Sequence, residues 1–266
     1  MIYSHSRLNT FEQCPFKYKL KYINKVKSEI PDTVETFLES RVHETLEKLY
    51  TDLEHQKKNT VEGLIQYYQS QWKKHWSEDI LIVKKQYPME NYQKMGEQYI
   101  KDYYTHYFPF DQNKTIAIED RIIIDLDESG EYRLQGYIDR LSERENGHYE
   151  IHDYKTNSRL PTPGHIKNDR QLALYAIGVK NQYPNVKDVQ LIWHFLKFNK
   201  EFCVTPSTMD VKKIRNEVDL LIDRIEHTSC FRPQPSKLCA WCEFKKICNY
   251  LEVLSASYTI KYSGHR

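Results

Sequence analysis

The sequence G-Y-I-D-R at residues 136–140 is followed, after a short polar turn, by I-H-D-Y-K-T at residues 151–156. Both stretches alternate apolar and polar residues, which predicts two strands of a hairpin. Asp153 and Lys155 stand two residues apart, so their side chains leave the same face of the second strand, about 7 Å apart along the backbone. Whether Asp139 joins them on that face depends on the register of the hairpin.

The turn of this hairpin contains an Asn-Gly pair at residues 146–147, which is typical of tight β-turns. A two-residue loop at this pair would place Asp139 opposite Tyr154, on the wrong face of the sheet. A three-residue loop over residues 145–147, with its glycine as the left-handed bulge residue, would place Asp139 opposite Asp153. We therefore predict the three-residue loop.

Two facing carboxylates can hold a hard divalent cation, and a lysine beside them could orient or deprotonate a water molecule. Phosphodiester hydrolysis needs these groups. An isolated D-x-K sequence, however, is more often an ordinary ion pair on a half-exposed sheet. The context of Asp139, Asp153 and Lys155 in the chain therefore decides between the two interpretations.

Apolar periodicity predicts the elements around the hairpin. Helices are predicted over residues 34–53, about 60–86, 89–107, 168–182 and 210–227. Strands are predicted from residue 114 onward and over residues 132–141, 149–154, 186–197 and 200–206. A further helical segment at residues 6–23 should be interrupted by Pro15 near Cys14. The expected fold is α/β, with a central mixed sheet flanked by helices and a helical elaboration at about residues 55–112.

The composition is that of a globular protein, with 39% hydrophobic and 29% charged residues among 266. We expect one domain over residues 1–266. No glycine-rich phosphate-binding motif occurs, and the net charge of +2 requires any nucleic-acid binding to come from local patches. The sequence has neither the layout of a signal peptide nor an apolar stretch of about 20 residues, so we expect a cytoplasmic location.

Three cysteines near the end of the chain form a C-x2-C-x5-C array. Three thiolates leave a four-coordinate site one ligand short, and a lone upstream cysteine is the natural fourth. The proposed ligands are Cys14, Cys239, Cys242 and Cys248. An iron–sulfur cluster and a zinc site both fit this set, and either would join residues 1–30 to residues 228–250. The remaining two, Cys203 and Cys230, are interpreted as buried thiols.

Basic and aromatic residues alternate beside Cys14, among them Lys17, Tyr18 and Lys19. Such a surface suits single-stranded DNA, because cations follow the phosphates and rings stack on the bases. The alternative is a solvated lysine face with tyrosines packed beneath it.

In their order along the chain, these motifs resemble those of the RecB-like branch of the PD-(D/E)XK nuclease superfamily. R-V-H-E-T-L-E at residues 41–47 resembles the first motif of that branch, G-x-I-D-R the second and D-Y-K-T the third. The Q-x-x-x-Y of Gln171 and Tyr175 resembles the fourth. The match extends from residue 14 to residue 248, nearly the whole chain.

The resemblance implies a role for each matched residue. His43, Asp139, Asp153 and the backbone carbonyl of Tyr154 would bind Mg²⁺ or Mn²⁺. Lys155 would be catalytic together with the two aspartates. Gln171 and Tyr175 would lie beside the site and engage the DNA.

The cysteine spacing resembles that of the iron–sulfur nucleases of the same branch, the AddB-type nuclease domains and the CRISPR-associated RecB-like exonucleases. This implies a largely structural 4Fe–4S cluster. The implied function is that of a metal-dependent deoxyribonuclease, an exonuclease on single-stranded or frayed DNA ends in DNA repair, recombination or processing. A helicase or another repair protein would be a further partner.

One departure from the family pattern concerns Glu39, which stands where the family usually has glycine, four residues before His43. A carboxylate there would crowd the helix or add charge near the metal. The alternative function is therefore a catalytically weak DNA-end-binding module, and a third is a zinc-dependent structural or regulatory protein. Glu119, on the first predicted strand, is an acidic residue that could approach the site, but we interpret it as a solvated strand position.

Overall fold

The structure is a computed structural model that describes residues 1–28, 32–84, 86–126, 132–145, 147–162, 164, 166, 169–206 and 208–248. The chain divides into two compact units. The first comprises Met1–His5 and Asp32–Asp219, and the second comprises the described residues of Ser6–Pro31 and Leu220–Arg266. The organisation as one domain over residues 1–266 stays a prediction.

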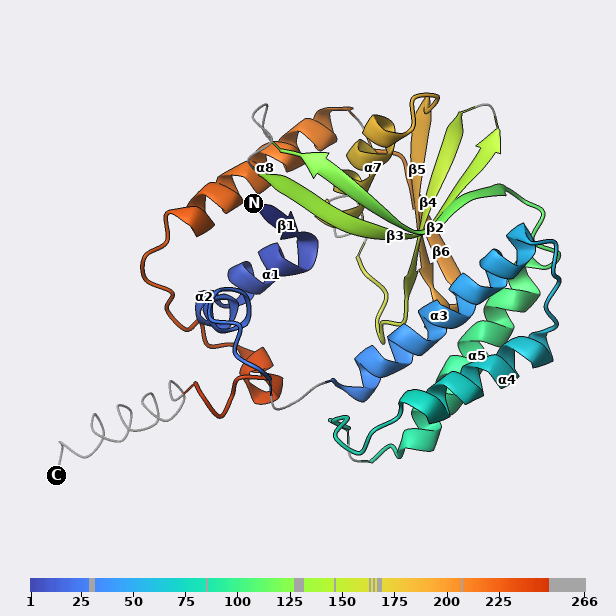
Figure 1. Cartoon of the computed structure of the whole chain (residues 1–266), viewed down its shortest axis with the longest axis horizontal. Coiled ribbons are helices and arrows are strands. Elements are labelled where there is room, and N and C mark those ends of the chain that lie inside the picture. The colour runs from blue at the N-terminus through green and yellow to red at the C-terminus, as the bar shows by residue number, and fades with distance from the viewer. Residues whose placement is uncertain are drawn as a thin grey trace. The chain divides into compact units, whose positions relative to one another are not determined.

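Six strands form one mixed sheet in the first unit (Figure 1). They are β1 (Ile2–Ser4), β2 (Lys114–Asp125), β3 (Arg133–Glu145), β4 (His148–Lys155), β5 (Asp188–Phe195) and β6 (Lys200–Val204). The order is β1-β3-β4-β5-β6, with β2 paired to β3 outside this path. The pairs β1/β3 and β4/β5 are parallel and the others antiparallel, which confirms the expected mixed sheet. β1 was not predicted, because three residues are too few for an alternating pattern.

Helices flank this sheet, as expected. α3 (Val34–Glu54), α4 (Val61–His75) and α5 (Met89–Tyr107) lie side by side (Figure 1), and α7 (Arg170–Gln182) packs on β2, β4 and β5. The apolar face of α3 lies in one buried cluster with residues of α4 and α5. Residue 168, the predicted start of α7, lies outside the described residues. None of the described helices is both long and apolar enough to cross a membrane.

The helix predicted over residues 60–86 is shorter in the structure. α4 begins after Thr60, whose Oγ1 accepts a hydrogen bond from the Gly63 N–H, and it ends at His75. Beyond an extended Trp76, the Asp79 N–H donates to Ser77 Oγ at 3.3 Å. Serine side chains that bond to nearby backbone compete with helix formation, which accounts for the early end.

The register of the β3–β4 hairpin is the predicted one, although the loop is not. Arg140 pairs with His152, a register in which Asp139 falls opposite Asp153. Glu145 pairs with His148, and the register shifts within β3 between Glu143 and Glu145, while Asn146 of the predicted loop lies outside the described residues. The extra residue is therefore a bulge in β3 rather than a third loop residue. A bulge and a three-residue loop both place Asp139 opposite Asp153.

The second unit contains α1 (His5–Gln13) from its second residue onward, α2 (Pro15–Tyr18), a π-helical turn at Lys19–Ile23 and a short 3-10 helix at Lys237–Trp241. α8 (Thr208–Glu226) contributes residues to both units. Cys14 is extended and caps α2, since its Sγ accepts a hydrogen bond from the Lys17 N–H. This confirms the predicted interruption at Pro15.

Candidate active site and cysteine cluster

Three of the predicted metal ligands meet where α3 approaches β3 and β4. His43 Nδ1 lies 3.5 Å from Asp139 Oδ1, and His43 Nε2 lies 2.7 Å from the carbonyl oxygen of Tyr154. The backbone N–H of Tyr154 donates a hydrogen bond of 2.7 Å to Asp139 Oδ2. The antiparallel register of β3 and β4 thus brings an imidazole, a carboxylate and a carbonyl oxygen into contact.

Charge and burial shift the pKa values of these groups in opposite directions. Burial alone lowers the pKa of His43, but the adjacent Asp139 carboxylate outweighs it and raises that pKa to about 9. Burial favours the neutral form of Asp139, yet His43 and the Tyr154 N–H hold the pKa of Asp139 below its ordinary value. At neutral pH the two side chains therefore form an ion pair.

Asp153 and Lys155 form the second part of the site. Lys155 Nζ lies 2.7 Å from Asp153 Oδ2, and Asp153 is only 5% exposed. Burial, together with the charge of Asp139, raises the pKa of Asp153 to about 6 although Lys155 opposes the shift. Burial lowers the pKa of Lys155, but Asp153 and then Asp139 raise it above its ordinary value, so the lysine is a cation at neutral pH.

Glu119 belongs to this site, contrary to its interpretation as a solvated position. One ligand atom each of His43, Glu119 and Asp139 lie within 4.8 Å of one another. In β2, Ile118 pairs with Arg140 and Asp120 with Ile138, so Glu119 stands opposite Asp139. Its backbone has φ +49, a left-handed conformation that is strained for glutamate. Burial and the Asp139 charge raise the pKa of Glu119 to about 7.

The donor set fits a hard divalent cation. Carboxylate and carbonyl oxygens together with one imidazole nitrogen are ligands for Mn²⁺ or Mg²⁺. The structure brings His43, Asp139 and the Tyr154 carbonyl together as predicted and adds Glu119. Asp153, the other predicted carboxylate ligand, is not part of this close group and pairs with Lys155 instead.

The Q-x-x-x-Y segment lies on α7, where Gln171 Nε2 donates a hydrogen bond of 3.1 Å to Tyr175 Oη. The Tyr175 ring packs against Gly136, the glycine of G-x-I-D-R. A Cβ added at Gly136 would lie 2.1 Å from Tyr175 Cε1. The motif therefore needs glycine because the tyrosine ring occupies the space of a side chain.

Replacing Gly136 with alanine should destabilise the protein by about 1–3 kcal/mol, because the new methyl group overlaps a buried ring. Thermal or denaturant unfolding measures the loss. Gly63→Ala on α4 is the matched control. Its Cβ would meet only Thr60 Oγ1 at 3.4 Å, so this variant should keep or gain stability. Equal stability of both variants would contradict the packing argument.

The four cysteines of the predicted cluster line one cavity of about 190 Å³ in the second unit: Cys14, Cys239, Cys242 and Cys248. Cys14 Sγ accepts hydrogen bonds from the N–H groups of Lys17 and Gln234, both at 3.4 Å, and Cys239 Sγ accepts one of 3.3 Å from the Ser236 N–H. All four cysteines are described, and no three of their sulfur atoms lie within 4.8 Å of one another. The four cysteines therefore share one cavity, and their arrangement does not distinguish an iron–sulfur cluster from a zinc site.

The basic segment beside Cys14 differs from the predicted surface. Tyr18 is 1% exposed and stacks on Phe231, so its ring is not presented for base stacking. Lys17 Nζ and Lys21 Nζ both lie close to Glu243 Oε1, at 3.3 and 3.2 Å. The packed tyrosine matches the alternative interpretation, in which tyrosines pack beneath a lysine face.

The two cysteines outside the cluster, Cys203 and Cys230, are both exposed, so their interpretation as buried thiols was wrong. Cys203 lies on β6, whose residues are exposed or half-buried throughout. Cysteine is an apolar residue that is often buried, and this general tendency did not predict that Cys203 and Cys230 are exposed.

Several solved structures resemble this chain, including the following two. The protein SSO0001 shares 13% identity over 93% of this chain and 85% of that chain, with a TM-score of 0.42. A protein from Eubacterium rectale, named “Putative exonuclease”, shares 12% identity over 90% of this chain and 86% of that chain, with a TM-score of 0.51, a likeness of fold. No curated protein sequence matches the chain. The family model of the PD-(D/E)XK nuclease superfamily matches residues 2–249, a range that includes both parts of the candidate active site. This chain therefore belongs to the PD-(D/E)XK nuclease superfamily.

Proposed function

We propose that this protein is a divalent-metal-dependent deoxyribonuclease that acts as an exonuclease on single-stranded or frayed DNA ends. Membership of the superfamily supports a metal-dependent nuclease. The observation that carries the proposal is the contact of His43 with both Asp139 and the Tyr154 carbonyl, next to the Asp153–Lys155 pair. Processing of DNA during repair or recombination, with a helicase or another repair protein as partner, belongs to the same proposal.

The residues of the site divide into two roles. His43, Asp139, Asp153 and the Tyr154 carbonyl would hold Mg²⁺ or Mn²⁺, and Glu119 is placed to join them. The bound cation would supply Lewis-acid stabilisation of the charge that develops on the phosphate. Lys155 would act as a fixed cation that orients the attacking water and the scissile phosphate, because its pairing with Asp153 keeps it protonated.

The DNA would pass over the residues beside this site. Gln171 and Tyr175 are close enough to bond to each other and present amide and hydroxyl groups to a backbone phosphate. Lys17 and Lys19 are proposed as further phosphate contacts, with Lys17 exchanging Glu243 for a phosphate. The buried ring of Tyr18 is not part of the proposal.

A nuclease assay on end-labelled single- and double-stranded DNA tests the proposed function. We expect Mn²⁺- or Mg²⁺-dependent loss of label from strand ends, no cleavage in EDTA, and none by Asp139→Asn. Cleavage that persists in EDTA would exclude the metal-dependent mechanism. DNA-end binding without any cleavage would support the alternative, a binding module. Glu39 favours that alternative, since its charge acts on both His43 and Lys155.

The affinity for Mn²⁺ should rise with pH. A cation needs the neutral imidazole of His43, whereas a pKa of about 9 keeps that ring protonated at pH 7. We expect the apparent affinity to increase by about tenfold per pH unit between pH 7 and 9, measured by calorimetry.

In EDTA, the stability of the folded protein should fall as the pH rises, whereas the metal affinity rises. The raised pKa of His43 contributes stability that is complete below pH 6.5 and is lost as the pH rises through 9. Thermal melting in EDTA should therefore show a falling Tm across this range. His43→Gln is the control for both measurements and should flatten both curves. A wild-type affinity that is independent of pH would contradict the assignment of His43 as a ligand.

The four clustered cysteines are proposed to bind a 4Fe–4S centre that joins residues 1–30 to residues 228–250. The cavity that all four cysteines line and the backbone N–H groups that donate to Cys14 and Cys239 support it. Zinc is the alternative. All six cysteines are free, which supports a reducing, cytoplasmic location.

A further inference from the structure

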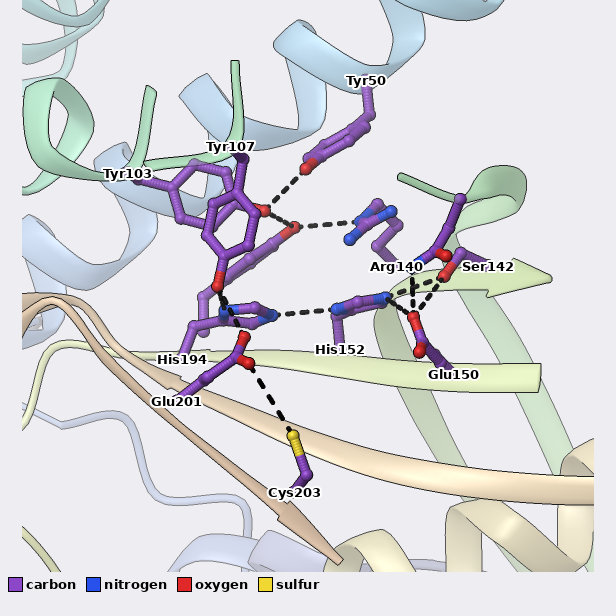
Figure 2. A network of polar contacts seen from close by, with 12 residues as sticks. Tyr50, Tyr103, Tyr107, Arg140, Ser142, Glu150, His152, His194, Glu201 and Cys203 are labelled. Carbon is purple, nitrogen blue, oxygen red and sulfur yellow. Dashed lines mark hydrogen bonds and ion pairs between the residues drawn. The ribbon is translucent and has the colours of Figure 1, made fainter. Parts of the chain in front are cut away.

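A second set of polar side chains lies on the face of the sheet opposite the carboxylates. Side chains alternate along a strand, so Arg140 points away from its neighbour Asp139, and His152 and Tyr154 point away from Asp153. Figure 2 shows these residues with side chains from β5, β6, α3 and α5. They surround a cavity of about 310 Å³ that the nuclease mechanism does not use.

The wall of this cavity contains a buried cation with unused donors. Arg140 is 5% exposed and lines the cavity. Its Nε donates to Tyr154 Oη at 3.3 Å, and its guanidinium carbon lies 4.1 Å from the centre of the Tyr50 ring. Among the described residues, no carboxylate pairs with Arg140 and none accepts a hydrogen bond from its two Nη groups. Buried guanidinium groups normally have an anionic partner within bonding distance, whereas the charge of Arg140 reaches the nearby Glu150 without a direct ion pair.

The two carboxylates that line this cavity, Glu150 and Glu201, are engaged by other groups. Glu150 Oε2 accepts a hydrogen bond from Asn113 and lies 3.6 Å from His152 Nε2, which accepts the Ser142 hydroxyl at 2.8 Å. Glu201 Oε2 accepts the hydroxyl of Tyr107 at 2.7 Å. A second arginine, Arg144 at the bulge of β3, lines the same cavity. The cavity is therefore lined by two guanidinium groups and two carboxylates, and the charges of both arginines act on Glu150.

The histidines of the wall add no competing charge. His152 Nδ1 lies 2.9 Å from His194 Nε2, and His194 Nδ1 lies 3.0 Å from Tyr107 Oη (Figure 2). Because Tyr107 donates to Glu201, its oxygen accepts from His194 Nδ1–H, and His194 Nε2 then accepts from His152 Nδ1–H. The chain of hydrogen bonds needs both rings neutral, which agrees with burial holding both pKa values well below the ordinary value.

The rest of the lining matches a planar ring. Tyr107 and Phe110 supply aromatic surfaces, and Gln112, Asn113 and Gln190 supply amide groups at the same cavity. Aromatic rings stack on nucleobases, amides bond to their edges, and arginines pair with phosphate. The volume lies at the lower end of the range for small-molecule sites, about 300–1,000 Å³.

We infer that this cavity binds a nucleoside monophosphate, with the phosphate on Arg140 and Arg144 and the base against Tyr107 and Phe110. The site lies on the opposite face of the sheet from Asp139 and Asp153. The inference rests on the cavity alone and does not depend on the proposed nuclease activity. An exonuclease would nevertheless release this class of molecule as its product.

Calorimetric titration of the full chain in EDTA tests the inference, with deoxyadenosine monophosphate, deoxyadenosine and inorganic phosphate as separate probes. We expect the monophosphate to bind at least about tenfold more tightly than deoxyadenosine or inorganic phosphate. Only the monophosphate contacts both the arginines and the aromatic rings. Arg144→Gln should weaken its binding by at least about tenfold. Arg144 is exposed at a bulge, so this variant avoids the risk of unfolding that Arg140→Gln carries.

Blocking the mouth of the cavity gives a second, independent variant. Cys203 is exposed and lines the cavity, so Cys203→Trp should close it and abolish binding, while Cys203→Ser should leave binding unchanged. Lys155→Ala should also leave binding unchanged. Binding lost in Lys155→Ala but kept in Arg144→Gln would place the nucleotide at the catalytic site and overturn the inference. Absence of binding to the wild type, or equal binding of all three probes, would overturn it as well.

Discussion

Lys155→Ala should lower DNA cleavage about a thousandfold while leaving the affinity for Mn²⁺ within about threefold of the wild type at pH 8. Lys155 Nζ pairs with Asp153 and does not contact the His43–Asp139 group. Its proposed role concerns the water and the phosphate rather than coordination. Loss of the cation should therefore remove stabilisation of the transition state without removing a ligand.

Cleavage rates and Mn²⁺ titrations on the same preparation separate these two effects. Lys180→Ala is the matched control, since Lys180 is an exposed lysine on α7 and should behave as the wild type. Loss of Mn²⁺ affinity with retained turnover would assign Lys155 to coordination instead. Full activity of Lys155→Ala would remove it from the mechanism altogether.

Cys14→Ser should bleach the brown colour expected of an iron–sulfur protein and lower the free energy of unfolding by as much as about 5 kcal/mol. Cys14 lies more than two hundred residues before the other three proposed ligands. A cross-link that closes so long a loop removes much of the entropy of the unfolded chain, so its loss is costly. DNA binding should weaken more than Mn²⁺ binding, because the lysines beside Cys14 lie in the same unit as the cluster.

Iron and zinc analysis of anaerobically purified protein, visible absorption and thermal unfolding measure the effect of Cys14→Ser. Cys203→Ser and Cys230→Ser should keep both colour and stability, because neither residue lines the cysteine cavity. Stoichiometric zinc without iron in the wild type would replace the cluster by a zinc site. A complete cluster in Cys14→Ser would show that the ligand set is wrong.

Local pattern was enough to predict the mixed sheet, the helices around it and the face shared by Asp153 and Lys155. These features repeat every two residues in strands and every three to four in helices, so they are readable within a short window. The register of Asp139 was also predicted correctly, although from the wrong loop. A bulge in β3 and a three-residue turn both insert one residue, and the sequence alone did not distinguish them.

Contacts between distant segments decided the rest. Glu119 reaches the site because β2 pairs with β3 in one register and adopts a left-handed backbone there, and the alternating pattern of the strand indicated neither. Tyr18 is buried because Phe231, more than two hundred residues later, stacks on its ring. Arg140 follows Asp139 directly in the sequence, yet Tyr50 of α3 packs against it and its guanidinium lines a cavity. In each case, residues that are remote in sequence surround the side chain. Those residues decide whether the side chain is buried, paired or charged, so its own stretch of sequence did not predict these properties.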